Sequence, residues 1–230
     1  ESKSEKTDAK PGLMAGMGIM VGEVTPHSAL IQVRLTRTDK LVDGDVAGAT
    51  GVVKFVLSES GDGASGNKMT RQLNATGNRD FIARAAFNDL KPGMAYHCAT
   101  WIGKDASRLR VGPSAQFQTL PGPNAAAKVR FVVVTGMNYG KFHGDDRIDR
   151  KIHLIENNTE LPKPYEGPDK HLGYPSLASI LALKPHFFVG TGDNVYYDTP
   201  KKPRAMTVPQ LRQKWHEQFV QPRYRDLFAK

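Results

Sequence analysis

Val129-Arg-Phe-Val-Val-Val-Thr135 and His186-Phe-Phe-Val-Gly-Thr-Gly-Asp193 are two continuous apolar runs in the second half of the chain. Such runs are typical of strands buried on both faces of a sheet. Between them, Tyr174 to Leu183 has apolar side chains at helical spacing before a proline. A strand, a crossover helix and a second strand predict two parallel strands whose carboxyl ends meet at one edge. Ligands of open α/β sheets bind beyond that edge, so we expect the chemistry at Gly136 to Tyr139 and at Asp193 to Asp198.

The rest of the second half is expected to contain helices and loops. The polar connection before the crossover helix is predicted to hold one short helix around Arg147 to Glu156. Further on, Val208 to Phe219 reads as a helix with Trp215 in the core, and Arg223 to Lys230 as a short helix. Two strands and a few helices cannot cover both faces of a sheet. We therefore expect residues 128–230 to be the start of a longer α/β domain, truncated here.

The first half predicts an all-β sandwich over residues 13–121. Its short runs are rich in β-branched and aromatic residues and are bounded by glycine, proline, asparagine or aspartate, without a sustained helical period. The predicted strands are Ser28 to Thr36, Val52 to Leu57, Arg79 to Phe87, Ala95 to Ile102 and Ser114 to Thr119. Leu120-Pro-Gly-Pro-Asn124 then marks a domain boundary. Residues 1–12 are expected to be a disordered, solvated leader.

Leu90-Lys-Pro-Gly-Met-Ala-Tyr96 places a leucine, a turn and then a tyrosine at the start of a strand. This order resembles the tyrosine corner of fibronectin type III and immunoglobulin-like sandwiches, in which the tyrosine hydroxyl bonds to nearby backbone. Cys98 lies two residues further, on the same face of the strand as Tyr96. We expect Cys98 to be a core residue and not a reactive thiol.

Composition and charge exclude several classes of protein. Lys+Arg 32 against Asp+Glu 23 gives the 230 residues a formal net charge of +9, which favours anionic partners. The basic residues are not interleaved with aromatic residues on any element, so no nucleic-acid partner is predicted. The single cysteine excludes an internal disulfide or a thiolate zinc cluster. No apolar run approaches the roughly 18 residues of a membrane span.

The motif Gly190-Thr-Gly-Asp-Asn-Val-Tyr-Tyr-Asp198 joins a strand end, two glycines, carboxylates and two phenols. Hard cations prefer oxygen ligands, and a carboxylate at a rigid strand end can bridge two of them. A phenolate suits a ferric ion, whose charge offsets the cost of ionising a group with a pKa of about 10. In the competing interpretation, Asp193 only caps a turn and both tyrosines pack on the surface.

The order of a sandwich, a boundary, a VRFVVVTG strand and a GTGDNVYYD strand resembles the PhoD-like alkaline phosphatases and phosphodiesterases. Their catalytic domain is of the four-layer, calcineurin-like metallophosphoesterase type. The resemblance implies hydrolysis of phosphate mono- or diesters by a metal-bound hydroxide, with iron and calcium as cofactors. It assigns Asp193 as the bridging ligand and Tyr196 as an iron ligand. It also implies an exported protein, secreted or periplasmic.

Two departures from the family pattern concern the metal ligands. The family commonly has Ser-Cys at the first strand end, with the cysteine on iron, where this chain reads Thr135-Gly136-Met137-Asn138. Either the first metal is bound differently, with Asn138 or Tyr139 as the candidate ligand, or it is absent. The family's later aspartate, asparagine and histidine ligands lie beyond the equivalent of Lys230. We accordingly expect this chain alone to be an incomplete catalytic unit.

Polar residues near the motif are candidates for binding the anionic ester. They are Asn194, Lys201, Lys202 and Arg204, although a solvated loop is the favoured interpretation of the basic residues. The histidines at 143, 153, 171 and 216 lack HxH or HExxH spacing and are expected to be solvated.

A rival hypothesis remains. In it, the loss of the ligand at Gly136 marks a non-catalytic relative whose sandwich acts as an extracellular binding or adhesion module. The sequence indicates no oligomeric state.

Overall fold

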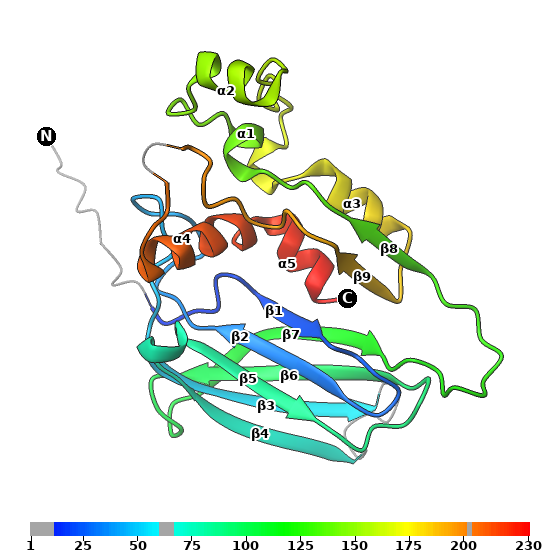
Figure 1. Cartoon of the computed structure of the whole chain (residues 1–230). Coiled ribbons are helices and arrows are strands. Elements are labelled where there is room, and N and C mark those ends of the chain that lie inside the picture. Colours follow the sequence, from blue (N-terminus) through cyan, green and yellow to red (C-terminus); the bar gives the residue numbers. More distant parts are fainter. Residues whose placement is uncertain (1–11, 60–66, 202–203) are drawn as a thin grey trace, which may run out of the picture.

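The computed structural model of the chain describes residues 12–59, 67–201 and 204–230. Antiparallel sheets occupy one side of the molecule, and a pair of parallel strands with its helices occupies the other (Figure 1). We term β1 to β7 the β unit and β8 to α5 the α/β unit. The predicted leader lies outside the described residues, apart from Gly12.

The β unit consists of two antiparallel sheets, with strand orders β1-β2-β5 and β4-β3-β6-β7. The strands are β1 (Ile19–Gly22), β2 (Ala29–Arg34), β3 (Gly51–Glu59), β4 (Lys68–Ala75), β5 (Ile82–Phe87), β6 (Ala95–Gly103) and β7 (Arg110–Gln118), with a 3-10 turn at Gly77–Arg79. Alternate residues of β2 are buried, as the sequence predicts. Both sheets contribute to one hydrophobic cluster that includes Ile31, Phe55 and Tyr96. The first half is thus predominantly β, as predicted.

The tyrosine corner is present. The Lys91 backbone N–H donates to the Tyr96 hydroxyl at 2.9 Å, and the Tyr96 ring stacks on Phe117 with centroids 5.6 Å apart. Cys98 is fully buried, and this burial raises the pKa of its thiol to about 12. The prediction that Cys98 is a core residue is therefore confirmed.

Strand β4 was not predicted, because its sequence carries no apolar alternation. Its residues Lys-Met-Thr-Arg-Gln-Leu-Asn-Ala are mostly exposed at the edge of the larger sheet. It pairs with β3 from Gly51 opposite Ala75 to Ser58 opposite Lys68. Pairing with the β3 backbone therefore positions β4, and the β4 side chains give no sequence pattern from which the strand could be predicted.

The predicted parallel pair is confirmed in the α/β unit. Strand β8 (Phe131–Val134) pairs in parallel with β9 (Phe187–Gly190), with Phe131 opposite Phe187. The helices are α1 (Tyr139–His143), α2 (Arg150–Asn157), α3 (Pro175–Ala182), α4 (Val208–Phe219) and α5 (Pro222–Phe228), with a 3-10 turn at Lys170–Leu172. Helix α4 has the predicted bounds and begins with a capping box between Thr207 and Gln210. Helix α1 is a single short turn that periodicity does not reveal.

The prediction that β8 is buried on both faces is wrong. Phe131 and Val133 are 55% and 52% exposed, whereas the alternate residues Val132 and Val134 pack with the cluster of α3 and α5. Among the described residues the helices cover only the face that carries Val132 and Val134. A continuous apolar run does not indicate which face of the strand the helices will cover.

The β unit and the α/β unit meet at His216 of α4. Its ring is buried, with Nδ1 2.6 Å from Asp45 Oδ1 and Nε2 2.7 Å from Asp80 Oδ2. Each ring nitrogen of His216 thus faces a carboxylate oxygen of the β unit. Asp80 also pairs with Arg34 at 3.2 Å. The prediction that His216 is solvated is wrong, and His153 is buried as well.

The pKa of the Asp80 carboxyl is shifted by these neighbours. Burial alone would raise the pKa of Asp80, but the hydrogen bond from His216 and the charge of Arg34 lower it below its ordinary value of 3.8. The Asp80 contribution to stability is therefore present above pH 3.8 and is lost as the pH falls through the lowered pKa of the folded state.

We predict that His216→Ala destabilises the fold by about 1–3 kcal/mol, because Asp45 and Asp80 lose their shared donor. Urea unfolding at neutral pH measures this change. The exposed His171→Ala is the matched control and should shift stability by less than about 0.5 kcal/mol. Below pH 3.8 the difference between wild type and His216→Ala should shrink. Equal stability of the two proteins at neutral pH would contradict the bridging role of His216.

Candidate functional site

The segments that follow β8 and β9 are tied together at the carboxyl edge of the strand pair. The Thr191 N–H donates to the Val134 carbonyl at 3.0 Å. The Met137 N–H donates to the Asp193 carbonyl at 3.1 Å. The edge predicted from strand topology therefore contains both expected segments.

The backbone after β9 is shaped to expose a carboxylate. Asp193 has a φ of 52°, in the left-handed region that aspartate tolerates better than most residues, and its side chain is exposed. Gly136, where the resemblance implies a cysteine in relatives, has a φ of 79°, and a Cβ there would meet nothing within 4 Å. The positive φ favours glycine at position 136, although there is room for a side chain.

Tyr196 lies against Asp193. Burial, followed by the hydrogen bond to Asp193 and the charges of Asp193 and Asp198, raises the pKa of the Tyr196 phenol to about 12. The structure thus brings together the carboxylate and phenol that the motif singled out. A neutral phenol donates to the carboxylate, and ionisation of the phenol requires a compensating positive charge.

Tyr197 has a different environment. Its side chain is 37% exposed, and its hydroxyl accepts from Trp215 Nε1 at 2.5 Å. Trp215, predicted to be a core residue, is 43% exposed and stacks on Phe219 with ring centroids 5.3 Å apart. That prediction is wrong, because the indole lies at the margin of α4.

Asn138 is engaged in local structure. Its Oδ1 accepts from the Lys141 N–H at 3.0 Å and caps α1, and its Nδ2 donates to Thr199 Oγ1 at 3.3 Å. The oxygen that would bind a cation already has a partner. The neighbouring Tyr139 is mostly buried, and this burial raises its pKa to about 12.

The residues predicted to bind the ester differ in their surroundings. The Lys201 ammonium pairs with the Glu156 carboxylate of α2, and Arg204 is exposed. Asn194 is half-buried, with its side chain close to Gly190. Lys202 lies outside the described residues.

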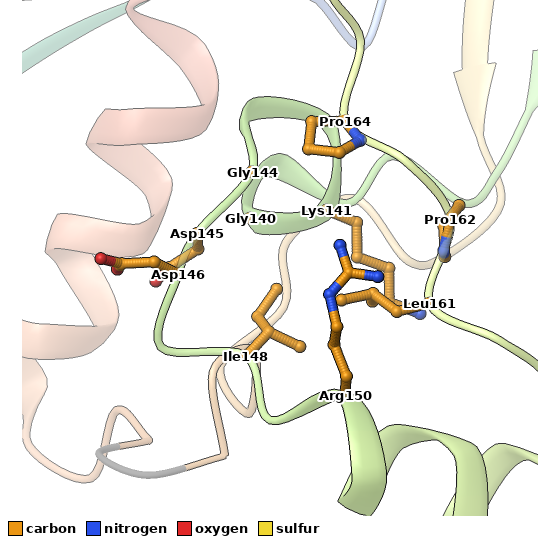
Figure 2. Close-up of a pocket in the computed structure, with 10 residues that line it drawn as sticks. All are labelled: Gly140, Lys141, Gly144, Asp145, Asp146, Ile148, Arg150, Leu161, Pro162 and Pro164. Carbon is orange, nitrogen blue, oxygen red and sulfur yellow. The ribbon is translucent and has the colours of Figure 1, made fainter.

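A second basic feature, missed in the sequence, is a cavity of about 340 Å³ beside α1 and α2. Figure 2 shows Lys141 and Arg150 extending toward Leu161, while Asp145 and Asp146 point away from them. Asp145 forms an ion pair with Arg147, and the distance from Arg147 Nη2 to Asp145 Oδ2 is 2.6 Å. Two basic side chains therefore extend along one side of the cavity, and its two carboxylates point away from them.

The described residues contain no group of three histidine, cysteine, aspartate or glutamate side chains arranged to hold a metal ion. Asp193 and Tyr196 therefore supply two oxygen ligands of a suitable kind without forming a complete site. Within the described part of the chain, no helix is long and apolar enough to cross a membrane.

Comparison with solved structures shows a PhoD-like fold. The structure of PhoD matches over 98% of this chain and 38% of its own, with a TM-score of 0.62 and 13% identity. The third fibronectin III domain of human KIAA0343 protein covers 56% of this chain and 99% of its own, with a TM-score of 0.32 and 13% identity. No protein family and no curated protein sequence matches the chain. The chain thus spans about two fifths of the PhoD structure it resembles.

We predict that Asp193→Asn lowers the pKa of Tyr196 from about 12 toward its ordinary value of 10.0. Removal of the carboxylate charge makes the phenolate less unfavourable, so the phenol ionises at a lower pH. Ultraviolet titration of phenolate absorbance measures the shift, with Tyr196→Phe assigning the signal. Tyr197→Phe should leave the Tyr196 titration in place. An unchanged Tyr196 titration in Asp193→Asn would show that the two side chains do not interact.

Proposed function

We propose that the protein is a metal-dependent hydrolase of phosphate mono- or diesters and that the carboxyl edge of β8 and β9 carries part of its active site. The observation that supports this function is the contact of Asp193 with Tyr196 at that edge, in a chain whose fold follows PhoD over nearly its whole length. The edge is also where ligands bind to open α/β sheets.

The fit of the residues to iron and calcium is partial. Asp193 and Tyr196 would hold the cations, and their oxygens match what hard ions prefer. The remaining ligands must be supplied from outside this pair. Asn138 would join only by sharing the oxygen that caps α1. When bound, metal ions of this class polarise a phosphoryl oxygen and lower the pKa of a coordinated water.

The chain's own residues contribute positioning and charge. The high pKa of Tyr196 keeps its phenol protonated near neutral pH, so a highly charged cation is needed to displace that proton. Lys141 and Arg150 place positive charge in the cavity next to α1, which begins shortly after β8. These groups, with Asn194 and Arg204, would attract and orient an anionic ester. Lys201 contributes less, because Glu156 neutralises it.

The test is metal content and phosphoesterase activity of the natural protein produced with iron and calcium supplied. We predict that Asp193→Asn and Tyr196→Phe each lower metal-dependent turnover of p-nitrophenyl phosphate or its bis-ester by more than about 100-fold. Tyr196→Phe should also remove the visible ferric-phenolate absorption. Tyr197→Phe is the matched control and should retain both metal and activity.

Two outcomes separate this function from its rival. The 230 residues expressed by themselves should show little or no turnover, because their described part contains no group of three histidine, cysteine, aspartate or glutamate side chains that could hold a metal ion. Natural protein that holds no metal and hydrolyses neither ester would overturn the proposal. It would favour a non-catalytic binding or adhesion module.

A further inference from the structure

A cavity of about 540 Å³ lies between the two units, and neither Asp193 nor Tyr196 lines it. One wall is the outer face of the β1-β2-β5 sheet, and the opposite wall comes from α4, α5 and β9. Figure 1 shows α4 and α5 lying between that sheet and the parallel strands. The volume is within the ~300–1,000 Å³ range of small-molecule sites, which often lie at domain junctions.

The body of this junction cavity is apolar and adaptable. Its lining includes Met17, Met20, Ile82, Phe188, Trp215 and Phe219. Methionine and aromatic side chains adapt to flexible apolar ligands at low cost. These surroundings suit an acyl or aryl group.

Two guanidinium groups give the cavity a positive charge. Arg84 donates through Nε to Gln32 Oε1 at 3.0 Å. Arg212 reaches only the backbone carbonyls of Gly77 and Asn78, both at 3.4 Å. Among the described residues, neither arginine forms an ion pair with a carboxylate.

The other titratable groups of the cavity already have partners. The Asp80 carboxylate is shared between Arg34 and His216, and Arg34 also donates to the Val46 carbonyl at 2.7 Å. Arg84 and Arg212 therefore remain available to a ligand. Guanidinium groups bind carboxylates and phosphates through paired hydrogen bonds.

We propose that the junction cavity binds a single-chain amphipathic anion, with an apolar tail among the methionines and aromatic rings and a carboxylate or phosphate at Arg84 and Arg212. The proposal does not depend on metal binding at Asp193 and Tyr196, because its headgroup and tail contacts lie on other residues. Gly190 and Asn194 also line the cavity, so a bound ligand would contact the turn after β9.

Trp215 provides a direct readout of binding. The chain has two tryptophans, so Trp101→Phe leaves Trp215 as the sole indole emitter. Titration with dodecanoate or dodecyl phosphate, below the concentration at which either forms micelles, should give a saturable change in Trp215 emission. Binding of dodecanoate alone identifies a fatty-acid headgroup, and binding of dodecyl phosphate alone identifies a phosphate headgroup. Either result supports the site.

The headgroup contact is tested by removing its charge. The double variant Arg84→Gln/Arg212→Gln should weaken binding of the anionic probe by about tenfold or more, but binding of neutral 1-dodecanol by less than about twofold. Equal affinity of wild type for 1-dodecanol and for both anionic probes would overturn the proposal.

The tail contact is tested by filling the cavity. Met20→Trp should abolish the calorimetric binding signal, whereas Val111→Trp, at an exposed position of β7, should retain it. Binding that persists in Met20→Trp, or titrations of wild type that never saturate, would also overturn the proposal. If Met20→Trp does not fold, the binding measurements on the Arg84→Gln/Arg212→Gln variant still test the proposal.

Discussion

The buried ring of His216, between Asp45 and Asp80, is the central contact that joins the two units. Asp45 and Asp80 belong to loops of the β unit, whereas His216 belongs to α4 of the α/β unit. The imidazole has a fixed orientation, because each ring nitrogen lies within hydrogen-bond distance of one carboxylate oxygen. This contact holds α4 against the β unit together with the hydrogen bonds of Arg212 and Gln213 to backbone carbonyls of that unit.

Gln218, on the opposite face of α4, connects this helix to the segment that carries the candidate site. Gln218 is buried and donates to the Met137 carbonyl at 3.3 Å and to the Tyr224 hydroxyl at 3.1 Å, while its Oε1 accepts from the Tyr174 hydroxyl at 3.0 Å. The Met137 N–H in turn donates to the Asp193 carbonyl. Every buried polar side-chain atom of the described residues has a partner. A continuous hydrogen-bonded route thus runs from the β unit to the turn that carries Asp193.

The sequence predicts those features that depend on local pattern. Alternation identifies β2, the Leu90 to Tyr96 corner identifies the start of β6, and the two apolar runs identify the parallel pair. The contact of Asp193 with Tyr196 follows from their spacing after β9. Each of these depends on residues close together in the chain or on a general rule of topology.

Features that depend on distant pairing could not be predicted. His216 meets partners 171 and 136 residues away, and no periodicity records that. The polar strand β4 is positioned by β3, and the exposed face of β8 depends on which helices cover it. The junction cavity exists only once both units are docked, so its two arginines look like ordinary surface residues in the sequence.

We propose that the turn after β9 is the functional centre of the molecule and that Asp193 and Tyr196 bind metal there. Anomalous diffraction at the iron absorption edge, from crystals of the natural protein grown with iron and calcium, tests this claim most directly. The account predicts a peak within bonding distance of both the Asp193 carboxylate and the Tyr196 phenol. An iron peak elsewhere, or iron-free density at the turn in metal-loaded protein, would contradict it.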